Sequence, residues 1–222
     1  MNIIAASRPW YSGMAERLQA RTGQEFRFIG SKAELTLEAL DALRPKYVFL
    51  PHWSHIIPTA IHSAHECVIF HMTDLPFGRG GSPLQNLIAR GIQGTRISAL
   101  RCGDGLDTGP IYLKKPLTLD GAAREIFLRA AAIIEEMIVE ILETNPVPVE
   151  QTGVPVVFAR RKPEEGNLAP LAELRQIYDF IRMLDADGYP KAFLETEHFR
   201  LEFNRASLQT DSVVADVRIT KK

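Results

Sequence analysis

Residues 70–83 read Phe70-His71-Met72-Thr73-Asp74-Leu75-Pro76-Phe77-Gly78-Arg79-Gly80-Gly81-Ser82-Pro83. His71 closes the apolar run Val68-Ile69-Phe70, and a loop shaped by prolines and glycines follows it. A short apolar run of this kind is typical of a buried strand in a parallel sheet. Because the carboxyl ends of strands in open α/β sheets face the ligand crevice, we expect His71 to lie at a ligand site.

Outward from this segment, short apolar runs alternate with amphipathic stretches, which favours an α/β fold with a mostly parallel sheet. The pattern predicts strands over residues 2–6, 25–29, 46–50, 67–71, 95–102 and 111–114, with helices over 14–21, 35–43, 56–64, 83–89 and 121–144. Beyond linker-like segments at 145–148 and 160–166 it predicts a helix over 171–184 and strands over 192–194, 199–203 and 213–219. We therefore expect a catalytic domain over residues 1–160 and a small helix-and-β appendage over 161–222 that docks on it.

The composition narrows the class of protein. The 222 residues are 45% hydrophobic and 24% charged, with a net charge of −1, so nothing in the bulk charge favours nucleic acid or an anionic membrane. No apolar stretch is long enough to span a bilayer, and the apolar start lacks the basic leader of a signal peptide. Cys67 and Cys102 sit in apolar runs without metal-ligand spacing, which indicates buried thiols, a cytoplasmic protein and no metal.

A second segment, Asp104-Gly105-Leu106-Asp107-Thr108-Gly109-Pro110, places a carboxylate in a glycine-bounded turn. An aspartate beside His71 would orient the imidazole ring and favour its charged form. Asp107 ranks first for this role, with Asp74 and Asp104 as competitors. The alternatives stay open at this point: a lone histidine is often a loop residue, and a turn aspartate often bonds its own backbone.

Together these residues resemble the folate-dependent formyltransferases: His71, Leu75-Pro76, Arg79-Gly80, Pro83 and Gly105-x-Asp107-Thr108-Gly109 occur in the family's order and approximate spacing. Residues 53–58, 158–165, 177–182 and 189–193 also resemble family segments. The resemblance implies a Rossmann-like fold, 10-formyltetrahydrofolate as cosubstrate and a primary amine as acceptor. It implies that His71 shuttles the proton and that Asp107 holds its ring. The residues implied to contact the cofactor are His55, Ile56, Ile57, Leu75, Pro76, Gly81, Gly103, Asp104, Gly105 and Leu106.

One position departs from the family pattern. The family has an asparagine two residues before the histidine that helps to stabilise the oxyanion, and this chain has Ile69 there. Loss of such a donor typically costs about 10²–10³ in rate. We favour a donor that has moved, to His52, His55, Asn86 or a backbone N–H near Gly80-Gly81. Protonated His71 acting alone, a shifted alignment and a slow enzyme or binding relic are the other readings.

The acceptor is inferred from architecture. Only about 30 residues follow Tyr189, less than a usual domain, and the chain lacks a basic surplus. We therefore expect a sugar-nucleotide N-formyltransferase that acts on an amino-deoxysugar and regard nucleic acid as an unlikely partner. The alternatives are a methionyl-tRNA-type enzyme, a formyl-folate hydrolase or a non-catalytic folate-binding module. The apolar strands near residue 222 could serve a homodimer or fill a core.

Overall fold

The computed structural model describes residues 1–222, which divide into two compact units. The first contains residues 1–80, 96–117 and 128–157, and the second contains residues 81–95, 118–127 and 158–222. Each unit is thus assembled from segments that interleave along the chain. The division into a catalytic domain over residues 1–160 and an appendage over residues 161–222 stays a prediction.

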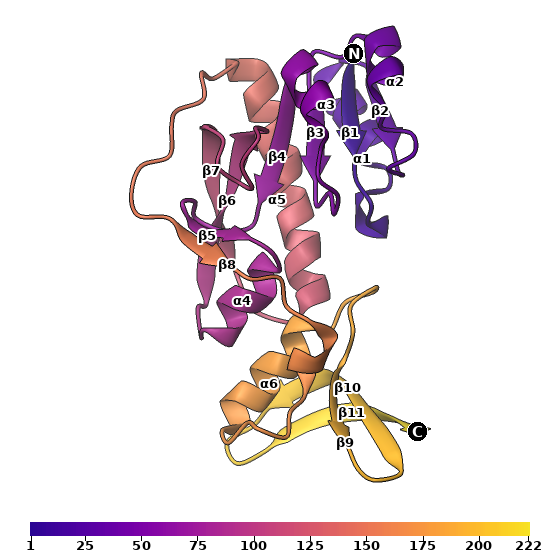
Figure 1. Ribbon diagram of the computed structural model, residues 1–222, viewed down its shortest axis with the longest axis vertical. Coiled ribbons are helices and arrows are strands. Elements are labelled where there is room, and N and C mark those ends of the chain that lie inside the picture. The colour runs from indigo at the N-terminus through magenta and orange to yellow at the C-terminus, as the bar shows by residue number, and fades with distance from the viewer. The chain divides into compact units, whose positions relative to one another are not determined.

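The first unit is built on a six-stranded sheet with the order β2-β1-β3-β4-β6-β7 (Figure 1). Its strands are β1 (Asn2–Ala5), β2 (Phe26–Ile29), β3 (Val48–Pro51), β4 (Cys67–His71), β6 (Gly94–Arg101) and β7 (Ile111–Thr118). The pairs β1–β2, β1–β3 and β3–β4 are parallel, and β6 runs antiparallel to β4. The expected α/β fold with a mostly parallel sheet is therefore confirmed.

Helices connect the parallel strands, as that pairing requires. They are α1 (Met14–Thr22), α2 (Leu37–Leu43) and α3 (Thr59–Ala64), and the part of α5 (Ala123–Thr144) that belongs to this unit runs along the sheet (Figure 1). The ends of α2 follow from local chemistry: the Thr36 hydroxyl accepts a hydrogen bond from the Ala39 N–H, and Arg44 ends the helix in the left-handed region before Pro45.

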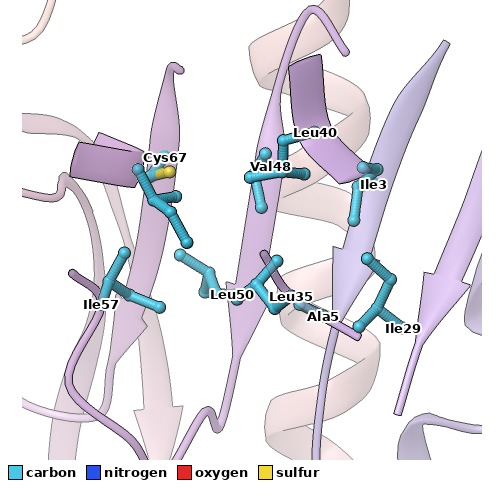
Figure 2. Packing of buried hydrophobic residues seen from close by; sticks show 10 residues of the cluster. Ile3, Ala5, Ile29, Leu35, Leu40, Val48, Leu50, Ile57 and Cys67 are labelled. Atoms are coloured by element: carbon cyan, nitrogen blue, oxygen red, sulfur yellow. The ribbon is translucent and has the colours of Figure 1, made fainter. Parts of the chain in front are cut away.

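An apolar cluster joins the strands and helices of this unit. It contains Ile3, Ala5, Ile29, Leu35, Leu40, Val48, Leu50, Ile57, Ile61 and Cys67. Figure 2 shows labelled side chains of this cluster spread across the sheet from Cys67 on β4 to Ile29 on β2. Burial of each large aliphatic side chain contributes about 1.5–3 kcal/mol, so the cluster holds the strand ends, and whatever side chains they carry, in place.

The second unit carries helices α4 (Pro83–Ala89) and α6 (Leu174–Met183) and an antiparallel sheet of β9 (Ala192–Glu195), β10 (Phe199–Leu208) and β11 (Val213–Lys221). This agrees with the expected helix-and-β appendage. Within it, buried Arg182 donates to Asp179 and to the carbonyl oxygens of Leu119 and Gly121. That network joins α6 to an earlier segment of the chain. None of the helices combines the length and the hydrophobicity that a membrane span requires.

Several short elements fall where the sequence predicted only loops. They are β5 (Phe77–Gly80) and β8 (Val156–Phe158), which pair with each other, and the 3₁₀ turns Pro9–Tyr11 and Pro163–Gly166. Ser82 precedes α4 without capping it through its side chain: its backbone is left-handed, and its hydroxyl accepts a hydrogen bond from the Arg161 N–H. A strand pair that joins residues 80 positions apart has no local sequence signal.

Both cysteines are free thiols whose surroundings disfavour ionisation. Burial, followed by the neighbouring Cys102 and Glu66, raises the pKa of Cys67 to about 12, and burial and the Asp107 carboxylate raise the pKa of Cys102 to about 11. Because the thiolate is the reactive species, we expect both to react with Ellman's reagent at pH 8 at least about 100-fold more slowly than in guanidinium. The rate should rise as pH approaches 11. Rapid labelling of the native protein at pH 8 would contradict this prediction.

Candidate active site

His71 is the last residue of β4, at the carboxyl end of the parallel strands. Side chains alternate between the two faces of a strand, so Cys67, Ile69 and His71 share one face. Cys67 belongs to the apolar cluster, and Ile69 packs against it. The cluster therefore ends at His71, where the imidazole is the first polar group on that face.

The imidazole is buried and both of its nitrogens face oxygen acceptors. His71 is 7% exposed, its Nε2 lies 2.8 Å from the Gly78 carbonyl oxygen, and its Nδ1 lies 3.4 Å from Asp107 Oδ2. A neutral ring can donate from one nitrogen only, whereas the charged ring donates from both. Each nitrogen of the His71 ring therefore faces an acceptor for its N–H, whichever nitrogen carries the proton.

Asp107 is held in a conformation that aims its carboxylate at this ring. Its φ of 54° lies in the left-handed region, which is uncommon outside glycine, and the residue is 7% exposed. Asp107 Oδ2 also accepts a hydrogen bond of 2.9 Å from the Gly80 N–H. The turn needs Gly109, because a Cβ there would lie 1.9 Å from the Arg101 carbonyl oxygen. The structure therefore brings together the histidine and the aspartate on which the two motifs were chosen.

The two competing aspartates lie elsewhere. Asp74 Oδ1 is 2.5 Å from Lys114 Nζ, which also donates to the Leu75 carbonyl oxygen. Asp104 Oδ1 accepts from the Thr59 hydroxyl at 3.2 Å and lies 3.6 Å from His62 Nε2. Neither carboxylate has a contact with His71, so the geometry favours Asp107 as its partner.

The segments expected to bind the cofactor form two loops that meet. The Thr59–Asp104 hydrogen bond joins the first residue of α3, directly after the loop over residues 52–58, to the loop that contains Gly103, Asp104, Gly105 and Leu106. Ile56 and Leu106, one from each loop, expose 86% and 65% of their surfaces. Two large apolar side chains left in solvent beside a polar site are suited to an apolar ring system.

The other expected cofactor contacts differ in accessibility. Ile57 and Leu75 are buried in the apolar interior, so their side chains serve the core and only their backbones are available to a ligand. Pro76 is half-buried, and His55 is exposed with its ring edge-on to Trp53. Gly81 belongs to the second unit, where a Cβ would lie 2.6 Å from Arg160 Cα. A glycine is therefore required at position 81 for close backbone packing.

Most of the groups suggested to replace the missing asparagine already have partners. Asn86 Nδ2 donates to the carbonyl oxygens of Gly81 and Ala159, and the N–H of Gly80 donates to Asp107. The Gly81 N–H donates to the Phe158 carbonyl oxygen. Asn86 and the N–H groups of Gly80 and Gly81 could therefore replace the asparagine as a donor only if these hydrogen bonds break.

His52 is another of the groups suggested to replace the asparagine. Burial, followed by the charge of Arg8, lowers the pKa of His52 to about 3, and its ring packs edge-on against Trp10. It is therefore neutral at pH 7.

The side chain at position 69 serves packing, because Ile69 extends the apolar cluster toward His71. The indole Nε1 of Trp53, which packs on the same cluster, is buried without a hydrogen-bond partner.

Sequence reasoning missed two polar residues that support the site. Ser98 on β6 accepts from the Leu75 N–H and donates to the Thr73 carbonyl oxygen, which fixes the loop after His71. Gln151 contacts Arg79, Asp107 and Gly109 through its side chain. Neither residue belongs to a short motif, and Gln151 lies 44 positions from Asp107 along the chain, so no local signal identified it.

Two family models match the chain. One described as "Formyl transferase" matches residues 22–125, and one described as "Methionyl-tRNA formyltransferase, C-terminal domain" matches residues 163–220. The first match contains both His71 and Asp107.

Individual proteins agree with these matches. A structure described as methionyl-tRNA formyltransferase from Clostridium thermocellum is 49% identical, with a TM-score of 0.96 and full coverage of both chains. The methionyl-tRNA formyltransferase of Wolinella succinogenes is 27% identical over 162 residues, which are 70% of this chain and 52% of that protein. The chain spans about half the length of such relatives. A likely sugar N-formyltransferase from Mycobacterium tuberculosis is 18% identical, with a TM-score of 0.71 and coverage of 89% and 92%, which shows the shared fold alone.

These findings overturn the expected sugar-nucleotide acceptor and the expectation that nucleic acid is an unlikely partner. Both are wrong, since a structure that matches the whole chain at 49% identity is described as a methionyl-tRNA formyltransferase. The small number of residues after Tyr189 was a poor guide to the acceptor, because that methionyl-tRNA formyltransferase structure matches this chain over its full length. Net charge misled it too: a value of −1 averages the whole surface and does not report local cation groups such as Arg160-Arg161-Lys162.

Proposed function

The chain belongs to the folate-dependent formyltransferase family, and we propose that it transfers a formyl group from 10-formyltetrahydrofolate to the amino group of methionyl-tRNA. The observation that carries the proposal is the buried His71–Asp107 pair at the carboxyl end of the parallel strands. The acceptor rests on the full-length similarity to a methionyl-tRNA formyltransferase. This substrate is compatible with a cytoplasmic location.

The two loops beside this pair fit the cofactor. Exposed Ile56 and Leu106 offer apolar surface for a flat ring, and the Thr59–Asp104 hydrogen bond keeps the loops together. Residues 103–106 would supply backbone N–H and carbonyl groups for the polar edge of that ring, and Gly103 leaves open space where a Cβ would stand. The bound cofactor supplies the activated formyl group.

The chemistry assigned to this chain is movement of a proton. The amine must lose a proton when it attacks, and the folate nitrogen must gain one when it leaves. His71 Nε2 would exchange its Gly78 acceptor for the reacting groups, while Nδ1 stays on Asp107. The carboxylate keeps the ring in one orientation and stabilises the imidazolium, which suits a group that first takes a proton and then returns it.

The proposal is tested by incubating the protein with 10-formyltetrahydrofolate and one of three additions: methionyl-tRNA, uncharged tRNA or an aminosugar nucleotide. We expect tetrahydrofolate release and formylmethionyl-tRNA only with methionyl-tRNA. Release without any amine would show a hydrolase, and binding without release would show a folate-binding module. Either result would refute the proposed transfer.

An exposed basic run offers a local contact for tRNA phosphates. Arg160 and Lys162 are exposed, and Arg160 has its backbone against Gly81. We expect Arg160→Glu to raise KM for methionyl-tRNA about 10-fold and to make this KM less dependent on salt concentration, because a phosphate contact is lost and fewer counterions are released on binding. KM for the folate should not change. Arg27→Glu, at the exposed position of β2, is the matched control, and an equal effect there would reject a local contact.

A further inference from the structure

Gln151 connects the two motifs of the site through one side chain. Its Oε1 accepts hydrogen bonds from Arg79 Nε at 3.1 Å and Nη2 at 2.7 Å. Its Nε2 donates to the carbonyl oxygens of Asp107 at 2.9 Å and Gly109 at 2.8 Å. The amide orientation is determined by its partners, since a guanidinium only donates and backbone carbonyls only accept.

The residues that Gln151 contacts are those that set the His71–Asp107 geometry. Arg79 precedes Gly80, whose N–H donates to Asp107 Oδ2, and Gly78, whose carbonyl oxygen faces His71 Nε2, precedes Arg79. On the other side, the carbonyls of Asp107 and Gly109 bracket the turn. One glutamine therefore holds both the loop after the histidine and the backbone of the aspartate.

The backbone of Asp107 needs such support. A non-glycine residue in the left-handed region is strained and persists only where neighbouring contacts determine its conformation. Two hydrogen bonds from one amide to the carbonyls of Asp107 and Gly109 fix the turn on both sides of Thr108. If the turn relaxed, the carboxylate would leave His71 Nδ1.

We propose that Gln151 is a positioning residue for the transfer reaction, and that its donation to the Asp107 and Gly109 carbonyls keeps the carboxylate on His71. The expected effect on turnover rests on the proposed function. The expected effect on the position of His71 rests on geometry alone. Gln151 itself need not touch a substrate.

The variant Gln151→Glu separates the two halves of the contact. A glutamate can still accept from Arg79 but cannot donate to the two carbonyls, and its second oxygen would face them. We expect kcat to fall about 100-fold with KM for the folate within about twofold, since a small misplacement of a reacting group has this cost. If Gln151 only held Arg79, the glutamate would support wild-type turnover, and that result would overturn the proposal.

A spectroscopic readout keeps the inference independent of the substrate. In protein labelled with ¹⁵N-histidine, the His71 ring signals are assigned by their loss in a His71→Asn variant. We expect Gln151→Glu to move the Nδ1–H signal of His71, and Gln24→Glu to leave it in place, since Gln24 is half-buried and accepts one hydrogen bond from Asn2 away from the site. Unchanged His71 signals in Gln151→Glu would refute the positioning role.

If Gln151→Glu fails to fold, Gln151→Met keeps the volume without the hydrogen bonds and is measured in the same way. A wild-type protein that forms no formylmethionyl-tRNA, yet whose His71 signal responds to position 151, would refute the proposed function and leave the positioning of His71 by Gln151 intact. If the wild-type protein formylates methionyl-tRNA and Gln151→Met has the same turnover and the same His71 signals, the proposed function would stand and the positioning role would be refuted.

Discussion

Replacing His71 with asparagine is expected to lower kcat for formylmethionyl-tRNA formation by about 10²–10⁴-fold, the range that a general acid–base group contributes. Asparagine is polar and close to histidine in size, and its amide can take the place of Nδ1, which lies 3.4 Å from Asp107 Oδ2. It cannot accept and return a proton near neutral pH. The rate should therefore fall while the protein keeps its fold. Steady-state release of tetrahydrofolate, followed with saturating methionyl-tRNA, measures the effect.

The chain provides a matched control for this substitution. His65 Nε2 lies 3.0 Å from Asp41 Oδ1, so it forms a second histidine–aspartate pair, at the end of α3 and away from the carboxyl ends of the strands. His65→Asn should leave kcat unchanged. A His71→Asn variant with wild-type turnover would remove His71 from the chemistry. A variant with a collapsed thermal transition would instead mark it as a structural residue.

Replacing Asp107 with asparagine is expected to be the second most damaging change, with a loss of about 10²–10⁴-fold in kcat. Asparagine tolerates the left-handed backbone better than most residues, so the φ of 54° can be kept. Its Oδ1 can still accept from the Gly80 N–H. What is lost is the negative charge that stabilises the imidazolium and holds Nδ1, as happens when the carboxylate of a catalytic triad is neutralised.

The double variant makes this prediction specific. If Asp107 acts only through His71, then His71→Asn combined with Asp107→Asn should be no slower than His71→Asn alone, because residues of one unit are not additive. Losses that multiply would show that Asp107 has a separate role. Asp41→Asn, the partner of the control pair, should have no effect on turnover.

Local pattern determined most of the fold. The apolar run before His71 formed the expected strand β4, and the stripe of leucines before Pro45 formed α2, because each depends on periodicity and on caps or breakers a few residues away. The family resemblance followed from the same short segments. The acceptor could not be derived in this way, because length and net charge describe the whole chain and not the surface that meets a substrate.

The sequence by itself determined the strand that ends in His71, the glycine-bounded turn of Asp107 and the family, since all three are written in contiguous residues. Only the tertiary structure decided that Asp107, and neither Asp74 nor Asp104, faces the imidazole, and that Gln151 holds the turn. The physical reason is distance along the chain. A hydrogen bond between residues tens of positions apart depends on how strands and loops pack, and the periodicity of apolar residues along the chain does not specify that packing.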